Sequence, residues 1–214
     1  MINGPWVDHY PPGIERTLPP VTDDIVAHLR LETVDPDRVA LRRDRRALGY
    51  GRLVEALHRV AAGLLAAGLA PGDRLALVAG ASPEHVIALL AALRVGAVVV
   101  EHDTAATAHE LAGLFADHGA RLAVVDAPVA DRLPAGVRSW DREVARAPRL
   151  PASWPYPGGG DVAVLLHTGG TTGAPKAAML THTNLRANTN QAIAWVPMLH
   201  EGAETFLALL RSEE

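Results

Sequence analysis

The apolar positions of this chain follow two different periods, and the change between them predicts its elements. From residue 50 to residue 67 the apolar side chains recur at helical spacing, forming one face: Leu53, Leu57, Val60, Ala61, Leu64 and Leu65. A helix opened by a capping serine, Ser82, is expected at 82–94, and a further helix is expected at 107–117. Short apolar runs predict buried strands at 74–79, 96–100, 121–125 and 161–167. Their regular alternation predicts an α/β fold with a mostly parallel sheet flanked by helices.

The segments outside this alternation carry more turn residues. Five prolines within residues 1–20 predict an extended N-terminal arm. The other expected elements are a helix capped by Thr22 and Asp23 that runs to about Thr33, a hairpin over 38–49, a short strand near 137–140 and a turn of helix near 141–147. We therefore expect two parts, an arm over 1–20 and an α/β portion over 21–214.

A glycine- and threonine-rich stretch follows the last of these strands and carries the strongest chemical signal. It reads H-T-G-G-T-T-G-A-P-K from His167 to Lys176. Glycines let a backbone approach a ligand closely, and consecutive N–H groups with hydroxyls form an anion-binding nest. Lys176 is the only lysine among 20 Lys and Arg residues, so a compact ammonium group stands here in a chain that otherwise uses arginine. The stretch predicts a phosphate-binding loop; the alternative is a surface turn rich in glycine and threonine.

The residues around this loop differ from those of the commonest nucleotide loops. The Walker pattern places Gly-Lys-Ser/Thr at the start of a helix, but here Pro175 precedes Lys176 and Ala177 follows it. The next residues, A-A-M-L-T, have the pattern of a strand, and we expect the following helix to be capped by Asn184, with His182 packed against the loop. We therefore predict a strand–loop–strand unit that binds phosphate without a helix dipole.

Composition narrows the class of protein. Hydrophobic residues make up 49% of the chain and charged residues 21%, which is typical of a globular protein. The net charge of −4 gives no indication of nucleic-acid binding, and the absence of cysteine excludes disulfides and thiolate sites. The N-terminus lacks the pattern of a signal peptide, and no apolar run reaches the ~20 residues that span a bilayer. We therefore expect a soluble, cytoplasmic protein.

Ten histidines raise the question of a metal site. His102, Asp103 and His109 lie near one strand end and the next helix start, but no ligand spacing recurs. We therefore expect surface histidines in preference to a metal centre. Glu101, His102 and Asp103 could line a cleft beyond the end of a strand, although a diverged loop is the interpretation we favour.

The segment T-G-G-T-T-G-A-P-K-A-A-M-L-T-H-T-N-L closely resembles the signature loop of the adenylate-forming enzymes, which include acyl-CoA synthetases, peptide-synthetase adenylation domains and luciferases. Three further segments look like bacterial long-chain fatty acid–CoA ligases: P-W-V-D-H-Y-P-P-G near the N-terminus, A-P-G-D-R-L-A-L at 70–77 and A-L-R-V-G-A-V-V-V at 92–100. The resemblance extends to about Leu210. It implies the N-terminal part of the large domain of such an enzyme.

This resemblance implies a two-step ligation that uses ATP, Mg²⁺ and coenzyme A. A fatty acid carboxylate attacks the α-phosphate of ATP to give acyl-adenylate and pyrophosphate, and the thiol of coenzyme A then displaces AMP. By the same resemblance, Lys176 neutralises the leaving pyrophosphate and Thr171 contacts Mg²⁺, which makes these two the implied catalytic residues. The implied nucleotide-binding residues are Thr168, Gly169, Gly170, Thr171, Thr172, Gly173 and Lys176.

The chain departs from the family pattern in three places. Ala177 stands where glycine is usual, and His102-Asp103 stands where Asn-Pro is common. The chain also stops where the family continues for several hundred residues. We therefore expect an incomplete large domain without the C-terminal domain, inactive on its own.

Two other functions stay open at this point, namely a non-catalytic remnant or phosphate-binding module of the same fold, and the adenylation of a different carboxylic acid. The expected partners are a fatty acid, ATP and coenzyme A, and no nucleic acid. Peripheral contact with a membrane is compatible with such a substrate. Self-association is also expected, through core surface that the missing half would leave exposed.

Overall fold

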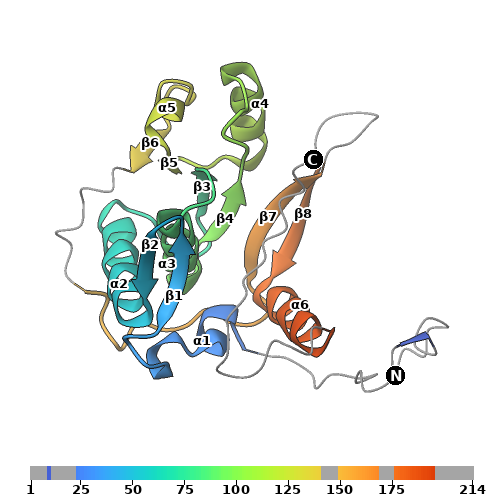
Figure 1. The fold of residues 1–214 in the computed structure, drawn as a ribbon. Helices are drawn as coiled ribbons and strands as arrows, with labels where there is room; N and C mark the ends of the chain where they lie inside the picture. The colour runs from blue at the N-terminus through green and yellow to red at the C-terminus, as the bar shows by residue number, and fades with distance from the viewer. Residues whose placement is uncertain (1–8, 11–22, 141–148, 169–175, 196–214) are drawn as a thin grey trace.

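A six-stranded sheet forms the centre of the fold (Figure 1). The structure, a computed structural model, describes residues 9–10, 23–140, 149–168 and 176–195. In the order β6-β5-β3-β4-β7-β8, the strands are β6 (Arg138–Trp140), β5 (Leu122–Val125), β3 (Arg74–Val78), β4 (Val98–Glu101), β7 (Val162–Thr168) and β8 (Lys176–Thr181). Neighbours from β6 to β7 pair in parallel, and β8 pairs antiparallel with β7. The mostly parallel α/β sheet expected from the sequence is confirmed.

Helices cover both faces of this sheet. They are α1 (Ile25–Leu29), the 3₁₀ turn η2 (Leu31–Thr33), α2 (Tyr50–Ala66), α3 (Pro83–Arg94), α4 (Ala108–His118), α5 (Ala127–Ala130) and α6 (His182–Trp195). Because side chains alternate along a strand, Leu75 and Leu77 of β3 join the main core with α2 and α3. Ala76 and Val78 of the same strand face the other way, into a second core with Phe115 of α4.

Capping residues set the starts of the helices that lead to the site. The Ser82 side chain accepts a hydrogen bond from the His85 N–H at 3.0 Å, and Pro83 occupies the first turn of α3. Thr107 and Glu110 form a capping box at the start of α4, and the hydrogen bonds from Thr107 lower the pKa of the Glu110 carboxyl. Both starts agree with the sequence prediction.

The first helix differs from its prediction. Asp24, and not Thr22 or Asp23, is the cap, since its Oδ1 accepts the N–H groups of Val26 and Ala27 at 2.9 Å. The helix ends at Leu29 because Arg30 adopts a left-handed conformation with φ of 46°, and the chain continues as η2. The prediction of a single helix that runs from the cap to about Thr33 is therefore wrong.

The remaining segments follow the prediction in part. β1 (Val39–Arg43) and β2 (Arg46–Gly49) form the expected antiparallel hairpin, which leads directly into α2. The short helix α5 is not predicted by the sequence, whereas the turn of helix expected near 141–147 lies outside the described residues. Among the described helices, none has the length and apolar character needed to cross a bilayer.

Candidate functional site

The antiparallel hairpin of β7 and β8 carries the ends of the predicted phosphate loop. His167 pairs with Ala177, and Thr168 pairs with Lys176. β7 leads into the loop and β8 follows it, so the predicted strand–loop–strand unit is confirmed, and the element that begins at Lys176 is a strand. The structure thus brings together Thr168 and Lys176. The other predicted ligands lie outside the described residues, and their roles stay predictions: Gly169, Gly170, Thr171, Thr172 and Gly173.

The packing of β8 sets the direction of the lysine. Ala177 packs against a small apolar cluster of Val98, Val100 and Leu165 on one face of the sheet. Since successive side chains of a strand point to opposite faces, Lys176 lies on the other face, where it is exposed. A lysine at the mouth of a loop can supply a point charge to a phosphate.

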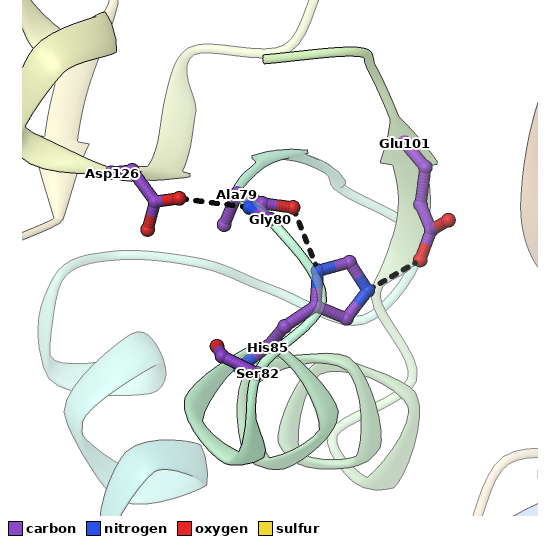
Figure 2. Close-up of polar contacts among 6 residues, drawn as sticks. All are labelled: Ala79, Gly80, Ser82, His85, Glu101 and Asp126. Carbon is purple, nitrogen blue, oxygen red and sulfur yellow. Dashed lines mark hydrogen bonds and ion pairs between the residues drawn. The ribbon is translucent and has the colours of Figure 1, made fainter. Parts of the chain in front are cut away.

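A polar network lies at the carboxyl ends of β3, β4 and β5 (Figure 2). The Nδ1–H of His85 donates to the carbonyl of Ala79 at 3.0 Å, and His85 Nε2 lies 3.1 Å from Glu101 Oε1. Asp126, directly after β5, accepts the N–H of Gly80 at 2.8 Å. Ligands of open parallel sheets bind beyond the carboxyl ends of the strands, so this network and the hairpin loop belong to the edge where a ligand is expected.

The hydrogen bonds of this network hold the side chains at this edge of the sheet in place. His85 follows the start of α3, Glu101 ends β4, and their side chains are mostly buried at 16% and 22% exposure. Both ring nitrogens of His85 face acceptor oxygens, so a protonated imidazole satisfies both contacts and Glu101 supplies the opposite charge. Sequence reasoning did not single out His85 or Asp126. The position of Asp126 after an apolar strand is the signal that could have identified it.

The histidines considered for a metal site do not converge. His102 is 7% exposed and contacts His118, whereas Asp103 accepts the Ala105 N–H at 2.8 Å and His109 is exposed. The expectation that His102 is a surface histidine is therefore wrong, because it follows Val100 on the buried side of β4. In the part of the chain that the structure describes, no three His, Asp or Glu side chains are arranged to hold a metal ion.

His182 and Asn184 lie at the end of the hairpin that is remote from the loop. Thr181 pairs with Val162 at the start of β7, and the N–H of His182 donates to the Asp161 carbonyl at 3.1 Å. The packing of His182 against the loop, expected from the sequence, is therefore wrong. The side chain is fully buried, and this burial lowers its pKa.

The cap of α6 is also different from its prediction. The helix begins at His182, one residue after Thr181. The Asn184 N–H donates to Thr181 Oγ1 at 3.2 Å, and Asn184 Oδ1 accepts the Thr181 N–H at 2.9 Å. Thr181 is thus the capping residue, and Asn184 makes the reciprocal contact from inside the first turn.

A groove of about 610 Å³ lies at the amino ends of β3 and β4. Its lining includes the first residues of two parallel strands, Arg74 and Val98, together with Trp154, Tyr156, Leu165 and Met179. A large apolar groove is a common place for a ligand, but parallel sheets bind ligands at the opposite ends of their strands. We give the second rule more weight, because the polar network and Lys176 are both at the carboxyl edge.

The chain has recognisable relatives. Residues 31–210 match the family of AMP-binding enzymes. The chain is 34% identical to a feruloyl-CoA synthase of Amycolatopsis sp., over 82% of this chain and 39% of the relative. It is 30% identical to a long-chain-fatty-acid–CoA ligase of Bacillus subtilis strain 168, over 96% of this chain and 45% of the relative. The chain therefore spans less than half the length of these curated relatives.

The fold of the chain is also similar to that of a solved structure. The crystal structure of apo MatB from Rhodopseudomonas palustris superposes with a TM-score of 0.73 at 29% sequence identity. The similarity covers 81% of this chain and 37% of that protein.

Proposed function

Because the chain belongs to the AMP-binding enzyme family, whose members are adenylate-forming ligases, we propose that it is the phosphate-binding portion of an ATP-dependent acid–CoA ligase. The acid in this proposal is a long-chain fatty acid. The observation that carries the proposal is the hairpin, which holds Thr168 opposite Lys176 at the two ends of a glycine- and threonine-rich loop. The cytoplasm, which supplies ATP and coenzyme A, is the proposed location.

The reaction has two steps in this proposal. A carboxylate oxygen of the acid attacks the α-phosphorus of ATP. The bond from this phosphorus to the oxygen that bridges to the β-phosphate breaks, and acyl-adenylate and pyrophosphate form. The thiol of coenzyme A then attacks the acyl carbon, AMP leaves, and a thioester remains. Lys176 stabilises the charge that develops on pyrophosphate, and removing one preorganised contact of this kind costs roughly 100- to 1,000-fold in rate.

A threonine hydroxyl and the phosphate oxygens of the nucleotide are suitable ligands for a magnesium ion that is bound together with ATP. Mg²⁺ prefers oxygen ligands and is commonly held by substrate phosphates with few protein groups. In such an arrangement Thr171 would supply the hydroxyl. When bound, the ion neutralises phosphate charge.

An aromatic acid is the second candidate substrate. The relative named feruloyl-CoA synthase has the higher of the two sequence identities, 34% against 30%. Any exchange in an ATP–pyrophosphate assay, run with palmitate and with ferulate, would distinguish the two acids. We expect the 214-residue chain to bind ATP without catalysing exchange on its own, because it spans less than half of each relative.

The outcomes of this assay are distinct. Exchange with palmitate would contradict the expected inactivity of the isolated chain and support the fatty acid, whereas exchange with ferulate alone would replace the fatty acid by an aromatic one. A chain that binds neither ATP nor inorganic triphosphate would overturn the proposal. Binding of both without exchange is the expected result, and it leaves the phosphate-binding role intact.

A further inference from the structure

Three histidines from separate elements converge beside the end of β7. His102 follows β4, His118 ends α4, and His167 precedes the last residue of β7. The Nε2 atoms of His102 and His118 are 2.9 Å apart, and their rings are stacked with centroids at 4.9 Å. The ring of His167 lies 5.4 Å from that of His102 and 5.9 Å from that of His118. We refer to these three residues as the histidine cluster.

The hydrogen bonds of the cluster define where its protons are. The N–H of Ala120 donates to His118 Nδ1 at 3.1 Å, so neutral His118 carries its own proton on Nε2. This Nε2–H donates to Nε2 of His102, which therefore carries its proton on Nδ1. Both residues are neutral in this arrangement, and at 7% and 3% exposure they are nearly inaccessible to water.

The same proton positions argue against a metal site. A histidine that binds a metal through one nitrogen almost always donates a hydrogen bond from the N–H of the other. His118 Nδ1 accepts a hydrogen bond from the Ala120 N–H, so its Nε2 holds a hydrogen where a metal would need a lone pair. His167 Nε2 is directed at the carboxylate of Asp117, at 3.3 Å. The cluster is thus a hydrogen-bonded and stacked unit.

The register of the sheet connects this unit to the phosphate loop. Val100 pairs with Leu165, so His102 and His167, each two residues further on, lie on the same face of adjacent strands. His167 in turn pairs with Ala177, and the next pair is Thr168 with Lys176. The cluster and Asp117 therefore tie α4 to β7 one residue before the loop begins.

We propose that His102, His118 and His167 are positioning residues for the phosphate loop, and that they hold the end of β7 in place only while the His102–His118 pair is neutral. This proposal rests on the proposed function, in which the ends of the loop place Lys176 against ATP. A positioning role predicts that the hairpin is affected more than the other strands, in addition to any general loss of stability.

Charge in the cluster is disfavoured by its surroundings. Burial and the neighbouring His118 and His167 lower the pKa of His102 to about 3. Burial, His167 and Arg74 lower the pKa of His118 to about 4, while the Asp117 carboxylate acts in the opposite direction. A proton on His102 Nε2 would face the Nε2–H of His118, and a proton on His118 Nδ1 would face the Ala120 N–H. Acid therefore breaks the arrangement.

Two substitutions of His102 separate its roles. His102→Gln keeps an acceptor oxygen near the place of Nε2 and cannot be protonated, whereas His102→Leu leaves the Nε2–H of His118 buried without a partner. We expect His102→Leu to weaken ATP binding about tenfold, because it leaves a buried donor unsatisfied. We expect His102→Gln to change ATP binding by less than about threefold, because it replaces the acceptor. Amide hydrogen exchange at 166–168 and 176–178 should accelerate only in the leucine variant, with β3 and β5 unchanged.

A measurement on the unsubstituted chain covers the case in which the leucine variant does not fold. Long-range ¹H–¹⁵N NMR spectra should show the Nδ1–H form of His102 and the Nε2–H form of His118 down to about pH 5, and hairpin exchange should accelerate when these forms are lost. Exchange that rises equally in all strands, or a hairpin unaffected by their loss, would overturn the proposal. If the unsubstituted chain binds no ATP, the proposed function fails, while the exchange and NMR results still decide the positioning role.

Discussion

Lys176 is paired with Thr168 across the β7–β8 hairpin, so the only lysine in the chain is the first residue of the strand that follows the loop. The backbone hydrogen bonds of a hairpin fix the relative position of such a pair more closely than a flexible connection would. Ala177, the next residue, is held by the apolar cluster of β4 and β7. The charge proposed to meet ATP is therefore positioned by the register of the sheet.

The stability of the fold should fall in mild acid because of the histidine cluster. The pKa of His102 is lowered to about 3 and that of His118 to about 4, below the value of 6.5 for an unperturbed histidine. Between these values the unfolded chain binds more protons, so the free energy of unfolding is greatest above pH 6.5 and decreases as the pH falls toward 4. Each histidine should account for a loss of about 2 kcal/mol between pH 7 and pH 5.

Urea unfolding at a series of pH values checks this prediction. His102→Gln removes one titrating group, so its stability should depend less steeply on pH than that of the unsubstituted chain. Equal slopes for the two proteins would show that His102 is not neutral in the folded state, contrary to the account. His182, whose pKa is also lowered by burial, should act in the same direction in both proteins.

Asp126 should stabilise the loop that follows β3. Its Oδ2 accepts the Gly80 N–H at 2.8 Å. Asp126→Ala should lower the free energy of unfolding by about 1–3 kcal/mol, because the N–H loses a charged acceptor. Asp126→Asn keeps an acceptor oxygen and should cost less. Urea denaturation measures both changes, and an alanine variant as stable as the asparagine variant would exclude this role for the carboxylate.

Exposed apolar side chains on the hairpin and α6 should promote self-association of the isolated chain. Leu166, Met179, Ile193 and Trp195 are all exposed, and Met179 is the most exposed of them at 70%. Met179→Glu should shift the chain toward monomer in sedimentation velocity, since a charge opposes association through an apolar surface. Val39, which is 42% exposed on the separate β1–β2 hairpin, gives the control Val39→Glu. Equal effects of the two substitutions would argue against an interface at β8.

Local signals explain most of what the sequence predicts correctly. Ser82 and Thr107 specify their helix starts with their own side chains, and apolar runs specify the parallel strands. The glycine, proline and lysine of the loop likewise indicate its strand–loop–strand form. Such features depend on residues that are adjacent in the chain, so a single sequence carries them.

The contacts that the sequence does not predict join distant residues. His102, His118 and His167 meet only because β4 lies beside β7 and the end of α4 reaches both. Strand order is decided by packing, and no short pattern encodes it. The misplacement of His182 has a simpler cause: an antiparallel return puts Thr181 opposite Val162, at the end of the hairpin far from the loop.

The most direct test of the account is an equilibrium titration of the chain with ATP, compared between Lys176→Ala and Lys176→Arg. We expect the alanine variant to lose measurable ATP binding and the arginine variant to retain part of it, since a guanidinium keeps the charge with a different geometry. Inorganic triphosphate should compete with ATP, and AMP should compete poorly. ATP affinity unchanged by Lys176→Ala would contradict the assignment of the hairpin loop as the phosphate-binding site.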